Sequence, residues 1–137
     1  MKIKNVITVT NGIITEGSQG QTLIKGVIMN LAADAISVKP GGDIKQLNVL
    51  GGIITTGENV SSYHVEGGIV HQLNVSGDIV ANGNNSRAVY VAENGQTPLN
   101  NISAISKQGI AVQIDKGKIT ARTGLKANGT KGNIIEK

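Results

Sequence analysis

The amino-acid sequence predicts an all-β fold, a parallel solenoid of about five coils with three short strands in each coil. The first observation is an internal repeat. Residues 42–57 (GDIKQLNVLGGIITTG) and 68–83 (GIVHQLNVSGDIVANG) are identical at 8 of 16 aligned positions, at an offset of 26 residues. A repeat of this period is typical of solenoids. The second observation is that apolar residues alternate with polar ones, which is the period of a strand.

The composition indicates a single domain, residues 1–137, with an aliphatic core. A chain of 137 residues is long enough for one such core. Glycine occurs 19 times, whereas phenylalanine, tryptophan and cysteine are absent. We therefore expect an interior of Ile, Val, Leu and Ala side chains. The lack of cysteine excludes disulfides, thiolate metal sites and a cysteine nucleophile.

Four segments have the pattern of the first strand in a coil: residues 36–38, 63–65, 89–91 and 112–114. Each places two apolar residues on one side and a polar or amphipathic residue on the other. Their last residues, Val38, Val65, Val91 and Ile114, are separated by 27, 26 and 23 positions. We expect these four side chains to stack inside the core, each about 4.8 Å above the previous one.

Glycine turns follow these strands, and a Leu-Asn pair recurs after a second short strand. Asparagine tolerates the left-handed backbone conformation, so we expect this residue to bend the chain between the second and third strands. Amides stacked one coil apart would also hydrogen-bond to one another. The predicted ladder consists of Asn48, Asn74 and Asn100. The third strand is expected at residues 49–54, 75–81 and 102–105.

The two ends are less regular than residues 35–117, as expected of the capping coils of a solenoid. In the irregular N-terminal coil or cap, residues 1–34, we place Ile7 and Val9 in a first strand. Asn11 and Gly12 form its turn, and residues 23–29 form a third strand; residues 29–34 are also compatible with a short helical turn. Residues 118–137 are predicted to form a short C-terminal coil, with a further strand beginning at residues 134–135.

Positive charge is concentrated at the C-terminal end. Residues 1–100 contain 6 Lys and Arg against 7 Asp and Glu, whereas residues 101–137 contain 7 against 2. The basic end includes Lys107, Lys116, Lys118, Arg122, Lys126 and Lys131. It is either a solvated surface or a docking surface for an acidic partner. We do not expect nucleic acid to bind there, because the lysines have no aromatic stacking residues among them.

Three short strands per coil, glycine turns and an asparagine after the second strand together resemble the right-handed parallel β-helix of the pectate lyase-like superfamily. The resemblance covers residues 35–117 and concerns architecture. That superfamily includes pectate lyases, polygalacturonases, adhesin passenger domains, and the tailspikes and other structural proteins of bacteriophages. A right-handed path agrees with the preference of parallel crossovers.

In enzymes of that superfamily, the substrate groove lies along the first strand and its flanking loops. The corresponding outward positions here are Ser37, His64, Tyr90 and Gln113, and the acids at the following turns are Glu66, Glu93 and Asp115. Acids in neighbouring coils would suit paired-carboxylate chemistry. The alternative is an ordinary polar turn, in which these acids interleave with Lys39 and Lys116. Short loops that cannot wall a groove favour this alternative, and no catalytic motif of the family can be transferred.

We expect neither a metal nor a cofactor. His64 and His71 fall on different strands, and the nonapeptide calcium repeat is absent. No apolar run has the length of a signal peptide or of a membrane span. A cytoplasmic protein is therefore expected.

The leading hypothesis is a non-enzymatic structural or attachment protein of a larger assembly. The resemblance points to a bacteriophage virion, assembled in the host cytoplasm, in which the protein contacts other structural proteins. We expect a homo-oligomer, and the resemblance favours a trimer. The second hypothesis is a carbohydrate-binding or polysaccharide-cleaving domain that uses the candidate face, and a third is an adhesin fragment.

Overall fold

Residues 2–3, 7–9, 13–15, 18–25, 28–30 and 33–137 are described by a computed structural model, with side chains from residue 33 onward. These residues form 19 strands and no helix. The strands are β1 (Lys2–Ile3), β2 (Ile7–Val9), β3 (Ile13–Thr15), β4 (Ser18–Lys25), β5 (Ile28–Asn30), β6 (Ile36–Val38), β7 (Asp43–Leu50), β8 (Ile53–Thr55), β9 (Ser61–Glu66), β10 (Ile69–Val70), β11 (Leu73–Val75), β12 (Ile79–Ala81), β13 (Arg87–Ala92), β14 (Gln96–Thr97), β15 (Ser103–Ser106), β16 (Ile110–Asp115), β17 (Lys118–Ile119), β18 (Lys126–Gly129) and β19 (Gly132–Glu136).

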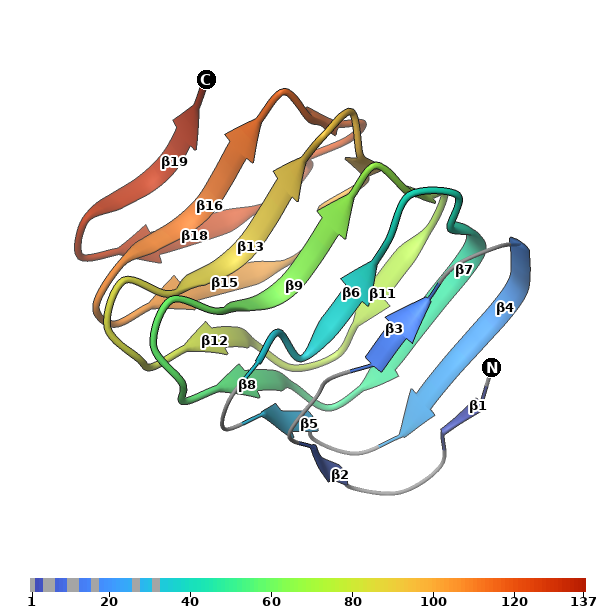
Figure 1. Ribbon diagram of the computed structural model, residues 1–137, viewed down its shortest axis with the longest axis horizontal. Helices are drawn as coiled ribbons and strands as arrows, with labels where there is room; N and C mark the ends of the chain where they lie inside the picture. The colour runs from blue at the N-terminus through green and yellow to red at the C-terminus, as the bar shows by residue number, and fades with distance from the viewer. Residues whose placement is uncertain (1, 4–6, 10–12, 16–17, 26–27, 31–32) are drawn as a thin grey trace.

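The strands stack into three parallel sheets that run the length of the molecule, with the two termini at opposite ends (Figure 1). Sheet A has the order β1-β4-β7-β10-β14-β17, with β11 also paired to β7. Sheet B has the order β2-β5-β8-β12-β15-β18, and sheet C has the order β3-β6-β9-β13-β16-β19. Residues 43–136 complete four turns, and the described N-terminal strands extend each sheet to six levels. The predicted all-β parallel solenoid is therefore confirmed, although the coil count differs slightly from the expected five.

The predicted core column is present in sheet C with the expected register. Val38 pairs with Val65, Val65 with Val91, and Val91 with Ile114. All four side chains are buried. Because the residues of one column have nearly the same shape, each coil repeats the packing of the coil below it.

Tyr63 is the one aromatic ring of the core. It stacks between Ile36 and Val89 in sheet C and is fully buried. Its hydroxyl lies 2.8 Å from the hydroxyl of Thr97 in sheet A, so the polar atom is paired inside an otherwise apolar interior. Burial raises the pKa of Tyr63 well above its usual value, although the Thr97 hydrogen bond opposes the shift. The ring is therefore a neutral core residue.

The N-terminal coil differs from the prediction. Residues 7–9 form β2, which pairs with β5 in sheet B, whereas β3 is the strand that pairs with β6 in sheet C. Thr15, rather than Val9, is the counterpart of Val38. The prediction failed because residues 7–9 and 13–15 are equally strand-like, and alternation alone does not say which belongs to which sheet.

The other N-terminal predictions are also revised. Leu23 and Ile24 belong to β4 in sheet A, and residues 28–30 form β5 in sheet B, so residues 23–29 are not one third strand. Met29 and Asn30 are extended rather than helical. The predicted turn at residues 11–12 lies outside the described residues. At the C-terminus, the expected strand at residues 134–135 is present within β19.

The chain does not bend at the asparagines where the bend was predicted. Asn48 and Asn74 lie within β7 and β11, and the residue with positive φ after Asn48 is Gly51, at 113°. Two coils further along, the residue with positive φ is Asn101, at 57°, and not Asn100. Left-handed asparagines do recur, but in the polar loops that lead into sheet C, at Asn59 and Asn85. The conformational argument was sound, but it was applied to the wrong asparagines.

The last coil exposes residues of the kind that are buried elsewhere. Ile119, Leu125 and Ala127 pack on the core but are only partly buried, and Ile134 is 40% exposed. Strand β19 pairs with β16 on one side. No helix suited to crossing a membrane occurs in the part of the chain that the structure describes.

Candidate functional site

The outward positions of sheet C form a single column, as predicted. Ser37 pairs with His64, His64 with Tyr90, and Tyr90 with Gln113. Ser37 is only 5% exposed, so it does not belong to the accessible surface. The three residues His64, Tyr90 and Gln113, together with the groups that bind them, are called the polar face below.

The predicted acidic residues do not form one column. Glu66 and Asp115 are both aligned with Ala92, whereas Glu93 is one residue further along, exposed and with a φ of 55°. The extra residue in this turn moves Glu93 out of line with the other two acids. Glu66 is paired with Lys39 at 3.2 Å, which is the interleaving expected of an ordinary polar turn.

Asp34 anchors the polar face at its N-terminal side, and sequence reasoning missed it. One carboxylate oxygen accepts a hydrogen bond from the backbone N–H of Ser61 at 2.7 Å, and the other lies 2.8 Å from Nδ1 of His64. Burial alone would raise the pKa of Asp34. The hydrogen bonds from His64 and Ser61 and the positive charges of His64 and Arg87 outweigh burial, so the pKa is lowered. Asp34 is therefore a carboxylate that orients His64.

Aromatic stacking continues the polar face into the next coil. The rings of His64 and Tyr90 are stacked, with centroids 4.8 Å apart and planes 19° apart. The guanidinium of Arg87 lies over the Tyr90 ring, 4.3 Å from its centroid, and its Nε donates to Ser61 Oγ at 3.1 Å. Arg87 is a second residue that sequence reasoning missed.

Asp115 closes the polar face at its C-terminal side. The same carboxylate oxygen accepts hydrogen bonds from the Tyr90 hydroxyl at 2.8 Å and from Gln113 Nε2 at 2.9 Å. Burial raises the pKa of Tyr90, and the hydrogen bond and negative charge of Asp115 raise it further. The tyrosine is thus a neutral donor to a carboxylate.

Two buried atoms of the polar face have no hydrogen-bond partner among the described residues, His64 Nε2 and Asp115 Oδ1. The pair formed by Asp34 and His64 has the geometry that orients a general base, because the carboxylate fixes Nδ1. A general base must, however, come within hydrogen-bond reach of the proton it takes. Burial of Nε2 leaves no such approach in this conformation.

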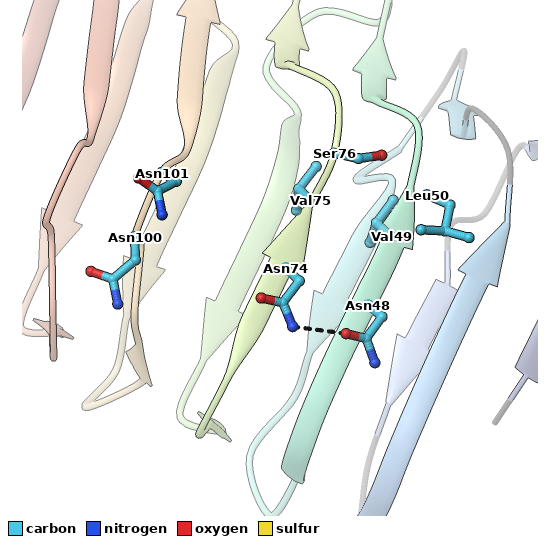
Figure 2. A pocket seen from close by; sticks show the side chains of 8 residues that line it. All are labelled: Asn48, Val49, Leu50, Asn74, Val75, Ser76, Asn100 and Asn101. Atoms are coloured by element: carbon cyan, nitrogen blue, oxygen red, sulfur yellow. Dashed lines mark hydrogen bonds between the residues drawn. The ribbon is translucent and has the colours of Figure 1, made fainter.

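One step of the predicted asparagine ladder is present. Asn74 Nδ2 donates to Asn48 Oδ1 at 2.8 Å, as Figure 2 shows. Asn100 Oδ1 instead accepts from the backbone N–H of Thr123 at 2.9 Å. Pro98 precedes this copy and supplies no N–H, so the strand formed by β11 in the previous coil is not continued. The ladder residues line a hollow of about 200 Å³ together with Val49, Leu50, Val75, Ser76 and Asn101.

The basic side chains are spread around the last coils rather than gathered into one patch. All six predicted residues of the basic end are exposed. Lys118 lies in sheet A and Lys126 in sheet B, while Lys107, Lys116, Arg122 and Lys131 lie in the connections. Such a distribution surrounds the end of the stack with positive charge.

The two histidines have separate carboxylate partners. His71 Nε2 lies 2.7 Å from Asp43 Oδ1, and His64 is bound to Asp34. Within the described ranges, no three His, Asp or Glu side chains gather as a metal site would require.

Comparison with protein-family models, with curated proteins and with solved structures finds no match for this chain. The chain is therefore classified by its fold, a parallel β-solenoid.

Proposed function

We propose that the protein is a non-enzymatic structural or attachment component of a larger assembly. The observation that carries the proposal is that the polar residues of sheet C bind residues of neighbouring coils. Asp34 binds His64 and Ser61, Tyr90 binds Asp115, and Lys39 binds Glu66. Each pair is 25 to 30 residues apart in sequence. The face thus acts as a brace between coils, which suits a rigid structural element.

The last coil supports association with other proteins. It exposes Ile134, and its sheet edges carry unpaired backbone groups of the kind that readily pair with another strand. Removing apolar surface from water contributes about 25 cal/mol of free energy per Å², which would favour covering such a region. The resemblance to bacteriophage β-helices suggests a virion component and a trimer, and both belong to the proposal.

The association test is static light scattering at micromolar concentration. We expect a mass that is a multiple of 14.1 kDa, with the trimer as the leading value. A monomer that remains folded on dilution would remove the physical argument for self-association.

A carbohydrate-binding or polysaccharide-cleaving role is the second candidate. It is favoured by the stacked rings of His64 and Tyr90, since aromatic rings commonly serve as binding platforms. The Tyr90 ring is, however, already in contact with His64 and Arg87, and its hydroxyl is bound to Asp115. Sugar binding would have to displace these contacts.

Substitution of the three acids distinguishes the two candidates. In a variant with Glu66→Gln, Glu93→Gln and Asp115→Asn, we expect the assembly state to be retained and no catalytic activity to be lost. Polysaccharide hydrolysis or elimination by the wild-type protein that disappears in this variant would establish an enzyme instead. The reducing ends released, and the absorbance of unsaturated products, measure both reactions.

A further inference from the structure

A small hollow of about 140 Å³ lies beside the polar face and is lined by two cations. Its lining residues come from three successive coils: Asn85 and Arg87, then Gly109, Ile110 and Gln113, and finally Lys131. None of the six is acidic. Two like charges that border one hollow repel each other, and an anion bound between them would attract both and outweigh that repulsion.

Arg87 interacts electrostatically with the Asp34 carboxylate, but its direct contacts are with other groups. Its Nε donates to Ser61 Oγ at 3.1 Å, and its guanidinium lies over Tyr90. Among the described residues, no carboxylate lies within 4.0 Å of it, and Nε makes its one side-chain hydrogen bond. The two terminal nitrogens therefore keep their donors. A guanidinium with a fixed plane and free terminal donors is suited to bidentate binding of an oxyanion.

Lys131 supplies the second charge from the connection between β18 and β19. Its Nζ donates to Asn85 Oδ1, which holds it beside the hollow. It forms no ion pair with a carboxylate in the described part of the chain. Because Asn85 uses its oxygen for Lys131, its Nδ2 group remains as a neutral donor.

We infer that this hollow binds a tetrahedral oxyanion, a phosphate or sulfate group, between Arg87 and Lys131. The fork of Arg87 would take two oxygens, the ammonium of Lys131 a third, and the amide of Asn85 would add a neutral hydrogen bond. The site is independent of the proposed function, since it concerns three coils of one chain and requires no assembly. The group is either a free ion or the acidic substituent of a larger ligand.

The test is the thermal midpoint of the protein in sodium phosphate, sodium sulfate and glycerol phosphate, each compared with sodium chloride at the same ionic strength and pH. We expect all three anions to raise the midpoint in a saturable manner. Isothermal titration calorimetry with inorganic phosphate gives the affinity. Arg87→Lys, which keeps the charge but loses the fork, and Lys131→Gln should each weaken binding by about tenfold or more, as expected for a charged hydrogen bond.

Lys45→Gln is the matched control, because Lys45 is exposed, belongs to β7 and lies outside the hollow. It should bind phosphate as the wild type does.

Phosphate and sulfate also stabilise proteins by exclusion from their surfaces. Equal shifts of the thermal midpoint in the wild type and in Lys131→Gln would identify that general effect and refute the site. The absence of any shift beyond that in chloride would also refute the site. Lys131 is exposed, so its variant is expected to fold even if Arg87→Lys does not. Tighter binding of glycerol phosphate than of phosphate would support an acidic substituent as the natural occupant, and the reverse a free ion.

Discussion

Asp34 shows how a single side chain ties the coils together. Its two oxygens serve two different partners in the following coil, the backbone N–H of Ser61 and the imidazole of His64. A charged acceptor strengthens both hydrogen bonds. The lowered pKa of Asp34 records this preference for the carboxylate form.

The pH dependence of stability follows from that shift. Because the folded-state pKa of Asp34 lies below 3.8, its ordinary value, the carboxylate contributes stability above pH 3.8 that is lost as the pH falls through the folded pKa. Asp34→Asn should lower the free energy of unfolding at pH 7 by about 1 to 3 kcal/mol and reduce the loss of stability below pH 4. Urea denaturation at pH 7 and pH 3 measures both. A variant with the stability and acid sensitivity of the wild type would show that Asp34 does not brace the coils.

Alternation predicts which residues of sheet C face outward, but not their partners. His64, Tyr90 and Gln113 were found from period two. Arg87 was missed because the alternation breaks next to it: Ala88 and Val89 are both buried, as are Ser62 and Tyr63 in the coil before. Asp34 was missed because its role depends on side-chain direction across coils, which repeat spacing does not encode. The hollow beside Arg87 also depends on the direction of side chains from three coils, which repeat spacing does not encode.

At the scale of the strands, the core is built from columns of aliphatic residues that must match between coils. Leu47 pairs with Leu73 in β7 and β11, and both are buried. A polar group in such a column has no partner and no access to water. The strand is therefore sensitive to charge at inward positions and tolerant at outward ones.

Leu73→Asp should unfold the protein, because burying an unpaired carboxylate costs several kcal/mol in a core of this kind. Leu73 is only 4% exposed. The control is Leu50→Asp, the same change at a leucine that is 48% exposed, which should remain folded. Far-ultraviolet circular dichroism and cooperative thermal unfolding report the outcome. A folded Leu73→Asp protein would mean that the column is not packed as described.

The first strand of each coil was predicted correctly where the repeat is regular. The third strands expected at residues 49–54 and 75–81 are instead divided, because residues 49–50 and 75 belong to sheet A and only β8 and β12 lie in sheet B. Between Ile36 and Ile114, the observed pairs follow the sequence repeat, because each coil has nearly the same length. In the first coil, no repeated motif marks the pairing of Thr15 with Val38. The bends also escaped prediction, since several asparagines of each coil tolerate positive φ and only tertiary context selects Asn59, Asn85 and Asn101.

At the scale of the whole molecule, the parallel stack is the claim on which the other conclusions depend. The polar face, the asparagine step and the anion hollow all require residues about 26 positions apart to lie in adjacent coils. Because the chain contains no cysteine, introduced cysteines can report on this register without interference.

The most direct measurement is disulfide formation in the double variant Asn48→Cys, Asn74→Cys. These residues are paired in parallel strands, so their Cα atoms are about 4.8 Å apart, within the range that a disulfide spans. The control is Asn48→Cys, Asn100→Cys, whose cysteines are two coils apart. Mass spectrometry of the oxidised monomer should find the intramolecular bond in the first variant and free thiols in the second. Free thiols in the first variant, or equal oxidation of both, would contradict the parallel stack.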